Sequence, residues 1–283
     1  MNLLNLPEIQ SGLIPFVSSL ILALVLHSRW PQWSALSALA GFYIGAASMG
    51  VLDLTPTRSA NRIFLLGLGF VALGSIVDII TNRSSNSSIR QVCNPIGLVI
   101  LAIVISVAWL IYSPLSRQGG MEMVGSLLSA IAWSALIAAG LLTLDRQPIR
   151  AYTAITFLAL AIGICTALGA SILLGQLAIG LSASCGALLL LACFTNVQRV
   201  PLKFIAVAAF LCAAIGVAGV IFAKVTWLTL LLLAGVPLIV RLPLPVAWPR
   251  LAQASVVSLF AALAGSAAVS LALWQSAQST SYY

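Results

Sequence analysis

Apolar residues in this chain gather in ten long runs, and nearly all of its charged residues lie in the gaps between those runs. A helix crosses a bilayer with about 20 apolar residues, and each run is close to that length. In lipid, backbone amides must bond within their own helix or around a closed barrel, and a barrel would need short alternating strands. The pattern therefore predicts an all-α integral membrane protein, a bundle of about ten transmembrane helices with short loops.

The predicted spans follow one another with only short connections. They are Gly12–His27, Trp33–Leu52, Ile63–Thr81, Pro95–Ser113, Val124–Leu144, a sixth that begins near Ala151, a seventh that ends near Thr195, Phe204–Ala223, Val225–Val240 and Leu251–Trp274. Ten such spans leave no room for a soluble domain, so residues 1–283 are predicted to form a single polytopic membrane domain. Two halves of five spans could form an inverted repeat.

The stretch Ala151–Gln198 contains no charged residue, and its 48 residues are too many for one span. As a single helix it would measure about 72 Å. A turn is predicted within Leu168–Gln176, which holds two glycines, the potential helix cap Ser171 and the polar Gln176. Two positions remain open for this turn. At the surface it is a short hairpin, and inside the membrane its amides could bind a polar group.

Lysine and arginine are distributed unevenly over alternate loops, which predicts the orientation. One side receives Arg29, Arg83, Arg90, Arg146, Arg150, Arg199, Lys203, Arg241 and Arg250, and the other receives Arg58, Arg62, Arg117 and Lys224. This places the first loop in the cytoplasm and both termini outside, in a bacterial-type plasma (inner) membrane. Because no Lys or Arg precedes the first run, we expect that run to be a retained helix rather than a cleaved signal.

Composition supports the membrane assignment and limits the chemistry. Hydrophobic residues make up 61% of the chain, charged residues 6%, and the net charge is +8. The basic residues occur singly or in pairs at span ends, so we interpret them as orientation signals and expect no nucleic-acid partner. There is one histidine, His27, and the five cysteines form no C-x-x-C pair. No metal or cofactor is expected.

Few residues are candidates for a binding site. Asp78 is the only acid inside a span, where an ionisable group is a functional candidate, but pairing with the nearby Arg83 at the helix end would also explain it. Ser171 and Gln176 in the predicted turn, and Trp109 and Trp133 inside their spans, are the other candidates for substrate binding.

Small residues recur at the spacing that brings helices into contact. Gly41 and Gly45 form a GxxxG pair, and Ala178, Ser182 and Gly186 lie on one face of the seventh span. Packing within the bundle explains both faces. A face for another membrane subunit, or for a second copy of the chain, is the alternative.

Three functions remain open. We favour a passive or weakly coupled carrier for a small polar or amphipathic solute over a non-catalytic accessory or assembly subunit of a larger membrane complex. An intramembrane lipid-modifying enzyme is least favoured, because no HExxH, GxSxG or Walker motif and no paired intramembrane acids occur. In length and span count the outline is similar to that of the drug/metabolite transporter superfamily, although the predicted outside N-terminus departs from it.

Overall fold

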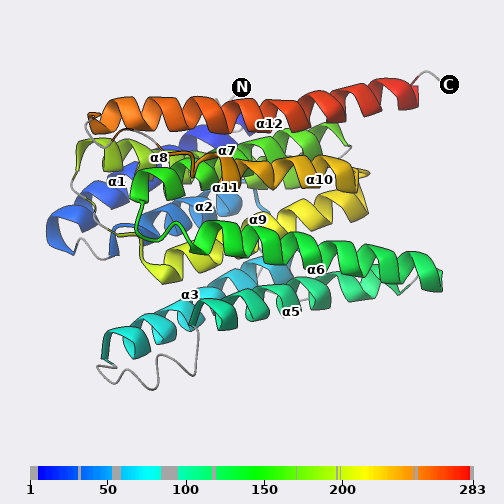
Figure 1. The fold of residues 1–283 in the computed structure, drawn as a ribbon, viewed down its shortest axis with the longest axis horizontal. Helices are drawn as coiled ribbons and strands as arrows, with labels where there is room; N and C mark the ends of the chain where they lie inside the picture. Colours follow the sequence, from blue (N-terminus) through cyan, green and yellow to red (C-terminus); the bar gives the residue numbers. More distant parts are fainter. Residues whose placement is uncertain are drawn as a thin grey trace.

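The computed structural model of the chain describes residues 6–30, 33–52, 59–83, 95–116, 119–169, 171–195, 197, 199–243, 245 and 248–280. The regular elements in these ranges are all helical and lie roughly along one common axis (Figure 1). Eight of these helical segments are long and apolar enough to cross a membrane. They are α1 (Ile14–Arg29) with the π-helical turn η2 (Ile9–Leu13) before it, α3 (Ser59–Arg83), α5 (Pro95–Leu115), α6 (Gly120–Leu142), α7 (Pro148–Leu168), α8 (Ile172–Phe194), α9 (Leu202–Ala223) and α12 (Arg250–Thr280). The chain is an all-α membrane protein, as predicted.

The second predicted span is shorter than expected. Its helix, α2, runs only from Leu36 to Ser48. It ends where Gly50 adopts a positive φ of 68° and the amide of Val51 donates back to the carbonyl of Ala46, a glycine-terminated helix end. Gly50 therefore ends the helix two residues after Ser48.

The ninth predicted span is broken rather than continuous. It consists of α10 (Trp227–Leu233) and α11 (Gly235–Ile239), which meet at Ala234. Pro237 explains the position of the break, because a proline removes one backbone donor and its ring collides with the carbonyl four residues earlier. The interruption at Ala234 falls three residues before Pro237.

Helix α9 lies at the centre of the bundle. Its apolar side chains are buried along almost its whole length, and α3, α5, α6 and α7 pack around it. Gly216 and Gly219 let Trp133 of α6 and Thr166 of α7 approach the α9 backbone. The middle of the protein is therefore a packed apolar core.

The predicted turn between the sixth and seventh spans is confirmed. Helix α7 ends at Leu168, and α8 begins at Ile172 with the hydroxyl of Ser171 accepting a hydrogen bond from the amide of Leu174. A Cβ on Gly169 would collide with the carbonyl of Ala223, so this hairpin lies directly against the end of α9.

The small-residue faces lie between neighbouring helices. Gly41 and Gly45 of α2 face Ser19 and Pro15 of α1, which a Cβ at either glycine would meet. The hydroxyl of Ser182 donates to the carbonyl of Thr156 across the contact of α8 with α7, at 2.8 Å.

The other two residues of the seventh-span face differ in their surroundings. Ala178 is buried. Gly186 is less closely packed, because a Cβ there would make only ordinary van der Waals contact with Thr156. The closest approach of α7 and α8 instead joins Gly163 and Gly175, and a Cβ on Gly175 would stand 2.9 Å from the carbonyl of Gly163.

Candidate functional site

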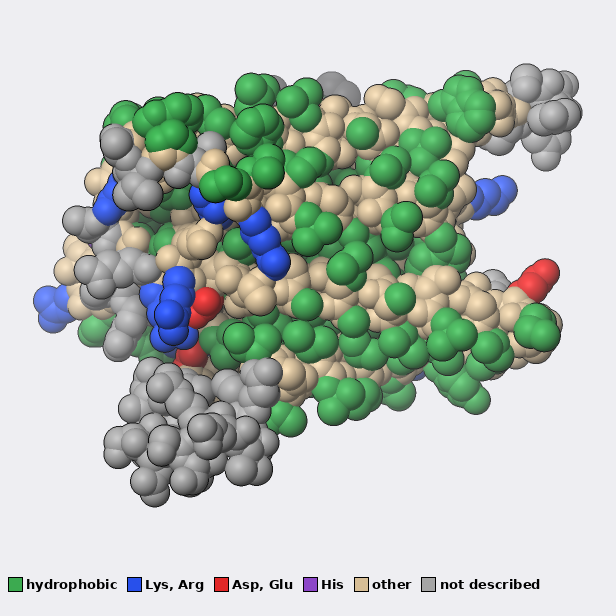
Figure 2. All heavy atoms as spheres, viewed as in Figure 1, with side chains coloured by type: hydrophobic (Ala, Val, Ile, Leu, Met, Phe, Trp, Pro, Cys, Tyr) green, Lys and Arg blue, Asp and Glu red, His purple; other side chains and the backbone are tan. Residues whose placement is uncertain are grey.

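Most basic side chains of the described residues share one end of the bundle. We call it the basic end. Helices α1, α3, α6, α8 and α11 finish there, and α7, α9 and α12 begin there. On the face drawn in Figure 2, the Lys and Arg side chains gather mainly at this end, on the left. The basic residues described at these helix ends are Arg29, Arg146, Arg150, Arg199, Lys203, Arg241 and Arg250.

Asp78 of α3 lies against the first turn of α9. Its carboxylate accepts hydrogen bonds from the backbone amides of Leu202 and Lys203, which open α9 and have no acceptor within it. Arg199 and the ammonium group of Lys203 bring two positive charges to the same place. The partner that the sequence predicted, Arg83, has a side chain outside the described residues, and the described partners come instead from α9 and the loop before it.

Gly74 makes this arrangement possible, one helical turn before Asp78. A Cβ on Gly74 would stand 2.9 Å from the Cβ of Lys203 and 3.1 Å from its backbone nitrogen, so only glycine lets the helices approach so closely. Lys203 is 8% exposed, and its Nζ lies 3.5 Å from the centre of the Trp33 ring. The ammonium group therefore lies on an aromatic face, and the negative charge of Asp78 attracts it.

These residues line a cavity of about 410 Å³, which we call the Asp78–Lys203 cavity. The residues that line it are Trp33, Ser75, Asp78, Ile79, Arg199, Pro201, Leu202 and Lys203. Two cationic side chains and the N-terminus of α9 favour negative charge inside it. In this structure Asp78 supplies that charge.

Arg199 connects this cavity to the loop after α6. Its guanidinium donates to the carboxylate of Asp145 through Nε at 3.0 Å and Nη2 at 2.8 Å. The amide of Val200 also donates to the carbonyl of Asp145, at 2.8 Å. The side chain of Arg199 is 61% exposed, so the ion pair contributes little to stability and mainly orients the arginine.

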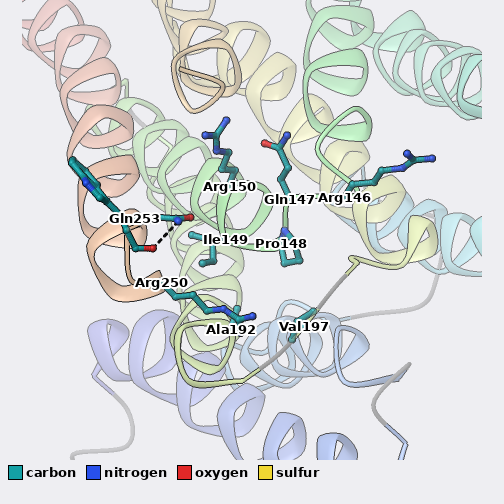
Figure 3. A pocket seen from close by; sticks show the side chains of 10 residues that line it. Arg146, Gln147, Pro148, Ile149, Arg150, Ala192, Val197, Arg250 and Gln253 are labelled. Atoms are coloured by element: carbon teal, nitrogen blue, oxygen red, sulfur yellow. Dashed lines mark hydrogen bonds between the residues drawn. The ribbon is translucent and has the colours of Figure 1, made fainter. Parts of the chain in front are cut away.

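A second cavity, of about 480 Å³, lies beside the first helical turns of α7 and α12. We call it the arginine cavity, because Arg146, Arg150 and Arg250 line it (Figure 3). Each arginine comes from a different segment: the loop after α6, the start of α7 and the start of α12. Two of the guanidinium groups donate to backbone carbonyls. Arg150 donates to the carbonyl of Arg241, and Arg250 donates to the carbonyl of Thr195.

The two tryptophans chosen from the sequence lie far from these cavities. Trp133 is 5% exposed and packs on Gly216 in the core, where its Nε1 has no hydrogen-bond partner among the described residues. Trp109 is 56% exposed on α5, and the guanidinium of Arg62 lies 5.3 Å from the centre of its ring.

The two polar residues of the turn lie at the opposite end of the bundle from Asp78. Ser171 caps α8, and Gln176 is half-buried in the second turn of that helix. The structure therefore does not bring the five candidates together. It joins Asp78 instead to Lys203, Arg199 and Trp33, which the sequence analysis did not choose.

A weak signal for this cluster was present in the sequence. Gly74 precedes Asp78 by one helical turn, which opens the helix surface beside the acid. Lys203 lies in the first turn of an apolar helix, where a cation opposes the helix dipole and needs a partner. Neither feature identifies the helix that comes into contact.

The described residues hold no group of three His, Cys, Asp or Glu side chains that could bind a metal ion. Searches for related proteins give no functional lead, because no protein-family model matches the chain and no curated protein shows significant similarity to it.

Proposed function

We propose that this protein is a passive or weakly coupled membrane carrier for a small solute that bears a carboxylate. One observation supports the proposal: a carboxylate, two cationic side chains and the opening amides of the central helix line one cavity at the basic end. Asp78 occupies the position in that cavity where an anionic solute would be most strongly attracted.

In this proposal Asp78 acts as a tethered competitor of the solute. A solute carboxylate that enters the Asp78–Lys203 cavity takes over the amides of Leu202 and Lys203 and the charge of Arg199. The contact between α3 and α9 then loses the hydrogen bonds at Asp78. Because α9 packs against α3, α5, α6, α7 and α8, a shift at its first turn is passed on to these five helices.

The proposal requires all ten apolar segments to cross the membrane. Support comes from where the two short segments begin and end. Helix α2 begins beside Trp33, which contacts Lys203 at the basic end, and the next helix begins near Arg62 at the other end. The segment α10–α11 likewise leads from Thr226, beside α9's far end, to Arg241 at the basic end.

An inverted repeat of five and five spans keeps partial support. The pairs α1–α2 and α7–α8, which would correspond, both pack as close hairpins through glycine contacts. The two short segments, however, stand second in the first half and fourth in the second half, so they do not correspond.

Exchange assays with purified protein in liposomes test the carrier. Liposomes are loaded with an unlabelled short-chain carboxylate, and entry of the labelled compound is measured for a panel of mono- and dicarboxylates. Lys203→Gln should lower exchange about tenfold or more, because it removes a charged partner of the solute, and Lys203→Arg should keep most of it. Lys224→Gln, which removes an exposed lysine at the far end, is the matched control. Exchange no faster than in protein-free liposomes for every compound would refute the proposal.

Asp78→Asn separates this role from a structural one. If Asp78 only closes a helix end, the variant folds and exchanges normally. If the carboxylate takes part in solute release, the variant folds but its exchange rate changes strongly. Glu122→Gln, at an exposed acid on α6 far from the cavity, should have no effect.

A non-catalytic subunit of a larger membrane complex is the second candidate. The packed apolar core around α9 favours it, because transport would require those helices to separate. Purification in mild detergent tests it directly. A monodisperse particle of the chain's own mass favours the carrier, and constant co-purification with the same membrane subunits favours the accessory role.

A further inference from the structure

The contact between α7 and α12 carries three hollows that follow one another along the bundle. The arginine cavity lies at the basic end. An apolar groove of about 180 Å³ lies in the middle, lined by Phe157, Leu160, Ala161 and Ile164 of α7 and by Ala262, Gly265, Ser266 and Val269 of α12. A third hollow at the far end includes Gly169, Lys224 and Gln275. The order of the first two, charged and then apolar, matches the order of groups in a phospholipid.

The arginine cavity suits a phosphate group. None of the described residues that line it is acidic, and the N-termini of α7 and α12, which have no acidic residue in their first turns, also face this region. The backbone carbonyls of Arg241 and Thr195 accept from Arg150 and Arg250 and thereby orient the two guanidinium groups. Gln147 adds a side-chain amide, and Gln253 adds a second one that already donates to the carbonyl of Trp248 at 2.9 Å (Figure 3). Side-chain amides have two N–H groups that can donate to phosphate oxygens.

The apolar groove lies at the depth of an acyl chain. It begins at Phe157 and ends at Ile164, seven to fourteen residues after Arg150 along α7. At 1.5 Å per residue this is about 10–21 Å below the arginine, within the hydrocarbon of one leaflet. At the floor of the groove, Gly265 lets α12 lie close to α7. A Cβ there would stand 3.2 Å from the Cβ of Ala161 and would push the two helices apart.

We propose that the seam between α7 and α12 binds one anionic phospholipid. Its phosphate lies in the arginine cavity, and one acyl chain lies in the groove between Phe157 and Val269. Basic pockets between transmembrane helices recognise anionic headgroups through this chemistry. A zwitterionic lipid is a poorer fit, because its ammonium group would face three arginines. This site is separate from the Asp78–Lys203 cavity and does not depend on the carrier proposal.

Native mass spectrometry of the purified protein tests the site by titration with phosphatidylglycerol and, separately, with phosphatidylcholine. One tightly retained phosphatidylglycerol per chain is expected. The double variant Arg146→Gln/Arg250→Gln should weaken its binding roughly thirtyfold. Ser266→Trp, which fills the groove from an exposed position, should also weaken the binding of phosphatidylglycerol.

Two variants serve as matched controls. Arg29→Gln lies at the basic end but outside the cavity, and Ala267→Trp changes the exposed neighbour of Ser266. Both should bind phosphatidylglycerol as the parent protein does. Thermal unfolding shows that each variant is folded.

Three results would overturn the proposal. Equal retention of the two lipids would show that charge does not select the ligand. Equal losses in Arg29→Gln and the double variant would show a diffuse attraction of the whole basic end. Displacement of the lipid by millimolar inorganic phosphate, with no effect of Ser266→Trp, would show a simple phosphate site without an acyl-chain groove.

Discussion

Gly74 of α3 and Lys203 of α9 approach so closely that a Cβ on the glycine would overlap the lysine backbone. The contact fixes α9 at the position along the bundle axis where its first backbone amides meet the carboxylate of Asp78. A glycine in one helix thereby determines which groups an acid four residues later can bind.

Gly74→Ala should therefore destabilise the protein by about 1–3 kcal/mol, because the new methyl group meets the backbone and the Cβ of Lys203, which cannot move aside without moving the helix. Thermal unfolding in detergent measures the effect. Gly69→Ala is the matched control in the same helix, since nothing lies within 4 Å of a Cβ there. It should leave stability unchanged or raise it by about 0.5–1 kcal/mol. Equal effects of the two substitutions would contradict the close contact.

A similar test applies to the hairpin between α7 and α8. A Cβ on Gly169 would collide with the carbonyl of Ala223, so Gly169→Ala should force the hairpin away from the end of α9. We expect a loss of about 1–3 kcal/mol in unfolding free energy. Gly125→Ala on α6, where a Cβ meets nothing, is the control. An unchanged melting temperature for Gly169→Ala would mean that this contact is absent.

The sequence predicted the helices better than their contacts. Long apolar runs have to be helices in lipid, and a cap such as Ser171 marks where one begins, so the hairpin at Gly169 could be located from local features. The early end of α2 at Gly50 could not, because a glycine serves equally in a packing face and at a helix end. The pairing of Asp78 with Lys203 joins residues 125 positions apart. Nothing in a one-dimensional pattern indicates which helix Gly74 will face.

Trp133 provides a test between core packing and solute binding. Its ring fills the space over Gly216, so Trp133→Ala should cost about 3–5 kcal/mol. Trp133→Phe should cost much less. The small cavity that it leaves is offset by removal of a buried N–H that has no partner among the described residues. Chemical denaturation compares the two variants. If Trp133→Phe were stable but inactive in the exchange assay, the N–H would instead serve a solute, as the sequence suggested.

The ion pair of Asp145 with Arg199 should contribute little to stability. The side chain of Arg199 is 61% exposed and that of Asp145 is 16% exposed, so water screens the pair from the arginine side, and such pairs contribute about 0–1 kcal/mol. Asp145→Asn should therefore shift the melting temperature only slightly, and the shift should vanish at high salt, which screens exposed charges. The backbone bond from Val200 to the Asp145 carbonyl is retained in the variant. A large loss of stability that does not depend on salt would show that a molecule other than this chain shields the ion pair from water.

The uneven charge of the two ends predicts how the protein lies in its membrane. Arg29, Arg146, Arg150, Arg199, Lys203, Arg241 and Arg250 share the basic end, while Arg62 and Lys224 are described at the other. Positively charged loops remain in the cytoplasm, so the basic end should face the cytoplasm and both termini should lie outside.

Reporter fusions after Ser116, Gln147 and Tyr283 test this orientation. One reporter is a phosphatase that is active only in the periplasm, and the other is a fluorescent protein that is active only in the cytoplasm. The phosphatase should be active after Ser116 and Tyr283 and inactive after Gln147. Periplasmic activity at Gln147 would reverse the orientation, and with it the side from which a solute reaches the Asp78–Lys203 cavity.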